Sequence, residues 1–298
     1  MDPRSFLDRI AGRPPVPTPE VASALGDLDR LARDRPDLAG PASGLAGLLR
    51  VAFAAEGPPA VDGPDLAAMA GGWQAGVPAF RHHPPRIDEA GLVARARALA
   101  GALGGSNPAA RALGSAIGGR RVDVGAWARE ALAGRPGEVD RSSEAAGLDP
   151  SMVAMVLRLA LLPPLARVSA ALGPLRPEGA WDRGDCPHCG SRPLLAESRG
   201  LEQRIFLRCG LCAAAWPGER LRCPSCGESS PHALHHSFVE GEQARCRLAH
   251  CDSCRYDWKV VSTLTALSPP AMIVADLATI HLDVLAEGRR GDRPDPAG

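Results

Sequence analysis

The sequence CPHCG occupies residues 186–190 and is followed by CGLC at residues 209–212; CPSCG at 223–227 and CDSC at 251–254 then repeat the pattern. Each unit also has a tryptophan four residues after its last cysteine. Two thiolate pairs with CxxC spacing supply the four soft ligands of a tetrahedral zinc or iron centre. The repeat therefore predicts two tetrathiol metal sites. The expected ligands are Cys186, Cys189, Cys209 and Cys212 in the first site, and Cys223, Cys226, Cys251 and Cys254 in the second.

The surrounding sequence favours metal binding over disulfide or dithiol chemistry. The cysteines number nine, and residues 1–12 (MDPRSFLDRIAG) contain no apolar segment typical of a secretory signal. We therefore expect a cytoplasmic protein, in a compartment where CxxC pairs bind metal more often than they form disulfides. We call the turn at each CxxC pair a knuckle. A thioredoxin-like CxxC is a single pair in a βαβ setting, and this chain has four knuckles that do not fit that setting.

The metal is expected to hold the cysteine modules together, because modules of this size bury too little surface to fold alone. Zinc would make the sites purely structural, whereas iron would allow one-electron transfer. The sequence leaves both metals open.

The charge balance argues against a nucleic-acid-binding or membrane-bound protein. Lysine and arginine together number 34, as do aspartate and glutamate, so there is no general basic field. The longest apolar run, residues 152–162, contains Arg158 and ends at two prolines. We expect it to be too short and too interrupted to span a bilayer.

Residues 1–178 have the periodicity of a helical body. Helix starts are predicted where a capping residue precedes proline, at Thr18–Pro19, Asn107–Pro108 and Asp149–Pro150. The last of these helices is apolar almost all round, with an expected kink at Pro163–Pro164, and should be central to the core. Further helices are expected at residues 45–55, at 87–103 and around Trp127.

No catalytic motif occurs in this helical half. It lacks a glycine-rich phosphate loop, a nucleophile elbow and HExxH, so we expect a scaffold or docking surface and no enzyme. His82 and His83 are followed by two prolines and are expected in a solvated loop.

Strand-like residues link the knuckles in the second half. Leu194–Leu195 and Arg204–Leu207 predict a hairpin, residues 233–240 and 243–248 predict a second pair with Gly241 in its turn, and WKVVSTL predicts a strand. Gly190 and Gly227 follow the second cysteine of their knuckles, where a residue without Cβ is easily accommodated.

Three polar or reactive side chains near the knuckles stand outside this pattern. Cys246 is expected to be a partly buried free thiol rather than a reactive one. His188 and His250 could each replace a cysteine as ligand, although four thiolates per site are already available.

These patterns predict an α+β fold in four parts. Residues 1–178 would form an all-α scaffold or docking domain, followed by tandem rubredoxin-like or zinc-ribbon modules at 179–220 and 221–265. Residues 266–298 would form a C-terminal helix and a disordered tail.

The order of these features resembles one known family. RLALLPPLARV (residues 158–168) precedes CPHCGSRP (186–193), FLRCGLCAAAW (206–216), RCPSCG (222–227), CDSC and VADLATIHLD (274–283). The chain is similar to the formate dehydrogenase accessory protein FdhE family, weakly in its first half and closely from about Met152 to Asp283.

The resemblance implies a cytoplasmic, non-catalytic maturation factor. Such a factor would bind iron through its two rubredoxin-like cysteine sets, associate with the formate dehydrogenase catalytic subunit, and adjust the redox state of that enzyme; a homodimer is compatible with the family. Asp276 and Asp283 match the family's terminal DLAxxxLD segment and are expected at the polar edge of an amphipathic helix. The alternative is a zinc-ribbon protein that binds nucleic acid or serves as a structural adaptor.

Overall fold

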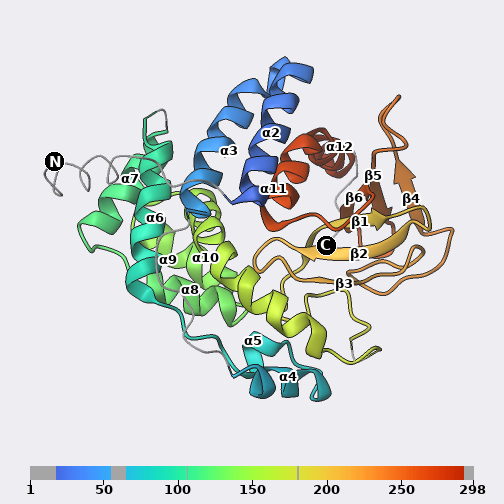
Figure 1. The fold of residues 1–298 in the computed structure, drawn as a ribbon, viewed down its shortest axis with the longest axis horizontal. Coiled ribbons are helices and arrows are strands. Elements are labelled where there is room, and N and C mark those ends of the chain that lie inside the picture. The colour runs from blue at the N-terminus through green and yellow to red at the C-terminus, as the bar shows by residue number, and fades with distance from the viewer. Residues whose placement is uncertain (1–17, 55–64, 106, 180, 292–298) are drawn as a thin grey trace, which may run out of the picture.

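The computed structural model describes residues 18–54, 65–105, 107–179 and 181–291, and confirms the expected α+β class (Figure 1). A helical body adjoins one six-stranded sheet. The helices are α2 (Pro19–Asp34), α3 (Ala39–Ala52), α4 (Leu66–Gln74), α5 (Ala79–His82), α6 (Glu89–Leu103), α7 (Pro108–Gly118), α8 (Val124–Leu132), α9 (Pro136–Ala145), α10 (Pro150–Leu172), α11 (Pro269–Ala278) and α12 (Ile280–Gly291), with 3₁₀ turns η1 (Pro36–Leu38) and η2 (Gly173–Leu175). The strands are β1 (Pro193–Arg199), β2 (Arg204–Cys209), β3 (Ala215–Pro217), β4 (Leu234–Ser237), β5 (Cys246–Cys251) and β6 (Asp257–Thr263).

The predicted helix starts are confirmed by their caps. The Thr18 side chain accepts a hydrogen bond from the Val21 amide, and the Asn107 side chain accepts from two amides of α7. Asp149 caps α10 through the Met152 amide at 2.9 Å. Each cap satisfies a backbone N–H that has no partner within the first helical turn.

Helix α10 continues through Pro163 and Pro164 and is the centre of the helical body. A proline has no N–H to donate, so the carbonyl four residues before Pro164 lacks its helical partner. Arg95 of α6 replaces that donor, with Nη1 3.2 Å from the Ala160 oxygen. The continuous helix corrects the expectation of a short apolar run: α10 and the bent pair α11–α12 are long and apolar enough to cross a membrane by length and composition alone. In this fold α10 is a core helix, with 13 buried residues.

The sheet is built from two copies of one three-stranded unit. Its strand order is β3-β2-β1-β6-β5-β4, in which neighbouring strands within each half are antiparallel and the central pair β1–β6 is parallel. Each half contains a knuckle before its first strand, a knuckle at the end of its second strand and a tryptophan in its third. The predicted module boundary near residue 220 lies in the chain between β3 and β4. The two halves nevertheless form one sheet, because β1 of the first half pairs with β6 of the second.

Both faces of the sheet are buried at its two central strands, β1 and β6. Consecutive residues point to opposite faces of a strand, and Leu195 and Ala196 of β1 lie in two different core clusters, as do Val261 and Val260 of β6. One cluster contains α10 and the first cysteine set, and the other contains α2, α3, α11 and α12. Figure 1 shows α11 and α12 between α2 and the sheet. The C-terminal segment (266–298) therefore contributes two helices to the core, and its predicted disordered tail is not tested, because residues 292–298 lie outside the described residues.

Candidate metal centres

The first four predicted cysteines form a closed tetrathiol cluster. Their sulfur atoms all lie within 4.8 Å of one another, and all four residues are fully buried. The Sγ atoms of Cys186 and Cys212 are 3.6 Å apart, and those of Cys189 and Cys209 are 3.3 Å apart. A disulfide would require about 2.05 Å, whereas sulfurs bound tetrahedrally at about 2.3 Å from a metal lie about 3.8 Å apart. The cluster could hold one metal ion.

The second four predicted cysteines form a similar but more open cluster. The Cys223–Cys254 and Cys226–Cys251 sulfur pairs are 3.6 and 3.7 Å apart. Cys223 and Cys251 are buried, but Cys226 and Cys254 are exposed. The two clusters thus have the same donor atoms and differ in access to solvent.

The knuckle backbone is the same at all four CxxC pairs. The residue after the second cysteine has positive φ each time: +74° at Gly190, +56° at Ala213, +78° at Gly227 and +59° at Arg255. This left-handed residue closes the turn, as when the Gly190 amide donates to the Cys186 carbonyl at 2.8 Å. Glycine adopts the conformation without strain, so the sequence revealed two of the four positions.

Burial disfavours the ionised form of several of these thiols. It raises the pKa of Cys186 and of Cys212 well above the ordinary value, and it raises the pKa of Cys223 in the second cluster. Four thiols cannot all ionise in an apolar enclosure unless a bound positive charge compensates them. A divalent or trivalent metal ion provides that charge, so the donor set fits zinc or iron.

Neither histidine beside the knuckles acts as a spare ligand in this geometry. His188 is 1% exposed and lies against the rings of Trp73 and Phe80, on the helical-body side of its knuckle. Burial lowers its pKa to about 4, so the imidazole is neutral. His250 contacts the carboxylates of Asp257 and Asp252, at 2.6 and 2.9 Å.

The helical body holds the first knuckle directly. The Trp73 indole and the Ala79 amide both donate to the Pro187 carbonyl, at 2.8 and 2.9 Å, and the Phe80 amide donates to the His188 backbone carbonyl at 2.7 Å. The Arg81 guanidinium donates to the Gly190 carbonyl at 3.2 Å. We call these four contacts, from α4 and α5, the knuckle clamp.

The sequence did not predict the knuckle clamp. Helices α4 and α5 were missed, and the expected loop at His82 and His83 is wrong in part, because His82 ends α5. Trp73 lies more than a hundred residues before its partner, so no local pattern indicates the contact.

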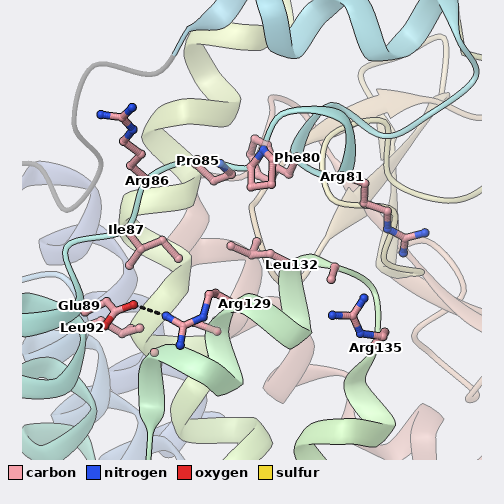
Figure 2. Close-up of a pocket in the computed structure, with 14 residues that line it drawn as sticks. Phe80, Arg81, Pro85, Arg86, Ile87, Glu89, Leu92, Arg129, Leu132 and Arg135 are labelled. Atoms are coloured by element: carbon pink, nitrogen blue, oxygen red, sulfur yellow. Dashed lines mark hydrogen bonds and ion pairs between the residues drawn. The ribbon is translucent and has the colours of Figure 1, made fainter.

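Arg81 also borders a hollow of about 680 Å³ in the helical body (Figure 2). Figure 2 shows Arg86 far from Arg81, while Arg129 is paired with Glu89. Arg135 is paired with Glu130 at 2.5 Å. The arginines therefore do not converge on one point, and two of them already have carboxylate partners.

The single lysine of the chain forms a buried ion cluster that the sequence did not predict. Lys259 of β6 is 4% exposed, and its Nζ contacts Asp276 of α11 and Asp283 of α12, the latter at 2.8 Å. These carboxylates thus anchor the terminal helices to the sheet, and their side chains, 22% and 51% exposed, lie on the polar side of α11 and α12. A lone lysine within the apolar strand WKVVSTL was the available signal.

The fold and the two clusters define a class of protein: a helical body that carries tandem zinc-ribbon-like modules. No family model matches the chain. Curated relatives named "Protein FdhE" do match, with 33% identity to that of Escherichia coli O127:H6 and 32% to that of Shigella boydii serotype 18. Each match covers 121 residues, which is 39% of this chain and 37% of the relative.

A solved structure, the FdhE protein from Pseudomonas aeruginosa, shares the fold. The TM-score is 0.61 over 91% of each chain, at 24% sequence identity. The curated relatives and the shared fold together confirm the resemblance to the FdhE family.

Proposed function

We propose that this chain is a cytoplasmic accessory factor that binds the catalytic subunit of a formate dehydrogenase during maturation. The observation that carries the proposal is the presence of two complete tetrathiol clusters on the fold of FdhE. The chain itself is not an enzyme in this proposal. Its helical body and sheet present two metal ions to a partner.

The different exposure of the two sites supports different roles for them. The first cluster lies in the core and is held by the knuckle clamp, so it stabilises the fold. The second has two exposed cysteines and is the one that a partner could approach. Iron bound there would supply one-electron exchange with the dehydrogenase, whereas zinc would leave a scaffold.

A nucleic-acid-binding ribbon receives less support from the structure. Nucleic-acid ribbons present exposed aromatic rings on which bases stack, but Trp216 is fully buried and Trp258 is 9% exposed. Both rings pack within the sheet core instead.

Affinity-tagged protein, purified without oxygen from cells that express a formate dehydrogenase, tests the proposal. The catalytic subunit is expected to co-purify, and Cys254→Ser should weaken the association or the dehydrogenase activity while leaving the protein folded. Metal analysis of the same sample separates iron from zinc, and its elution volume tests the homodimer. Failure of the subunit to co-purify, with nucleic acid retained instead, would favour the alternative.

A further inference from the structure

We propose that Glu242, Cys246 and His281 form a third metal site, suited to a divalent transition ion such as Zn²⁺, that joins helix α12 to the start of strand β5. Cys246 is the one cysteine of the nine that belongs to neither tetrathiol cluster. The proposal does not depend on the proposed function.

Three separate elements bring the donor atoms together. Cys246 is the first residue of β5, Glu242 lies four residues earlier in the β4–β5 connection, and His281 is in the first turn of α12. One potential ligand atom of each lies within 4.8 Å of the other two. The Glu242 Oε2 atom is 3.5 Å from the Cys246 sulfur and 2.9 Å from the His281 Nε2. The oxygen–sulfur separation is close to the edge of a tetrahedral zinc site, about 3.6 Å, and the oxygen–nitrogen separation would lengthen by about 0.5 Å on binding.

The ring nitrogens of His281 are a second observation that supports the metal site. Both of its ring nitrogens are buried, and neither has a hydrogen-bond partner among the described residues. The short approach of Nε2 to the Glu242 carboxylate therefore lacks the alignment of a hydrogen bond. Buried polar atoms normally find partners, and a shared cation would satisfy both groups at once.

The donor set is that of an open metal site. One sulfur, one nitrogen and one carboxylate oxygen leave a fourth tetrahedral position for water or another ligand, as in zinc sites with three protein ligands. Cys246 is 6% exposed, but the Glu242 side chain is 27% exposed and the His281 side chain 19%. An ion can thus enter from the Glu242 side. On binding, the thiol loses its proton to solvent and the sulfur–metal bond forms, with no change in oxidation state.

Neighbouring charges set the strength of the site. Arg245 and Arg35 both act electrostatically on this cluster, Arg245 on Cys246 and Arg35 on Glu242. Arg35 is itself paired with Asp37, at 3.0 Å, which offsets its charge. We therefore expect weaker binding than at the tetrathiol clusters, with the third ion lost first to a chelator.

Metal counting on the full chain tests the site. Protein with both tetrathiol clusters filled is incubated with excess Zn²⁺, freed of unbound ion by gel filtration, and analysed for metal. The wild type should hold three ions per chain, and Cys246→Ala, Glu242→Gln and His281→Ala should each hold two. Glu240→Gln and His83→Ala are the matched controls, since both residues are exposed and lie outside the cluster; they should hold three.

A second measurement uses the unmutated chain, in case a variant fails to fold. The rate at which N-ethylmaleimide alkylates Cys246, mapped by mass spectrometry, should fall about tenfold in saturating Zn²⁺, because the metal-bound sulfur is shielded. A wild type that binds two ions with no protection of Cys246 would overturn the proposal. So would a third ion that persists in all three variants.

Discussion

A chelator should remove metal from the two tetrathiol clusters at very different rates. The second cluster has two exposed cysteines, whereas the first is enclosed and must open before a chelator can reach it. Opening breaks the knuckle clamp, which consists of four hydrogen bonds from Trp73, Ala79, Phe80 and Arg81. At about 1 kcal/mol net for each bond, opening costs about 4 kcal/mol. Since about 1.4 kcal/mol is a factor of ten, release from the first cluster should be about 10³-fold slower.

A colorimetric chelator assay measures both releases in one trace. In protein loaded with metal at the two tetrathiol clusters only, one equivalent should appear in a fast phase and one in a slow phase, and Cys254→Ser should abolish the fast phase only. Arg81→Ala removes one bond of the clamp and should speed the slow phase about fivefold, because about 1 kcal/mol is lost. Arg33→Ala, at an exposed position of α2, is the control. Two equivalents that leave in a single phase, or a slow phase unchanged by Arg81→Ala, would refute the reasoning.

Three further substitutions test other features of the fold. Lys259→Met leaves Asp276 and Asp283 without their cation, but these carboxylates are 22% and 51% exposed and can be hydrated. We therefore expect the free energy of unfolding, measured by urea denaturation, to fall by about 2 kcal/mol. Adding Asp276→Asn should recover part of this loss. His188→Leu should change the unfolding free energy by less than about 1 kcal/mol and keep the metal content, since neither ring nitrogen has a partner among the described residues; loss of one metal ion would show instead that His188 is a ligand. Gly184→Ala would place a Cβ 1.6 Å from the Pro224 carbonyl oxygen and should cost about 1–3 kcal/mol, whereas Gly44→Ala, with open space around it in α3, should be neutral or stabilising by thermal melting.

The cysteine clusters were predictable because their signal is local and repeated. CxxC spacing defines each knuckle, and the duplication indicates which knuckles pair. The same holds for the long helices, whose caps at Thr18, Asn107 and Asp149 lie next to the residues that they serve.

The missed features depend on contacts between distant segments. The parallel pairing of β1 with β6, the donation from Arg95 to Ala160 and the knuckle clamp each join residues far apart in the chain. Lys259 is the single lysine of the chain, but its two carboxylate partners lie on helices whose position the sequence did not indicate. Ala213 and Arg255 take the left-handed conformation without being glycine, so the geometry of their knuckles could not be read from residue type.

The central parallel pairing β1–β6 has a consequence for assembly. It joins the first strand of one unit to the third strand of the next, so the two units are related by translation, and a contact of this kind does not close on itself. The strands at the two ends of the described sheet are again a third strand, β3, and a first strand, β4, so the same pairing between successive chains would extend the sheet without limit. Both are only three to four residues long, and β3 ends at Pro217, which cannot donate a backbone hydrogen bond. The short edge strands and the proline thus disfavour the same strand pairing between chains, so it occurs once, as β1–β6, within each molecule.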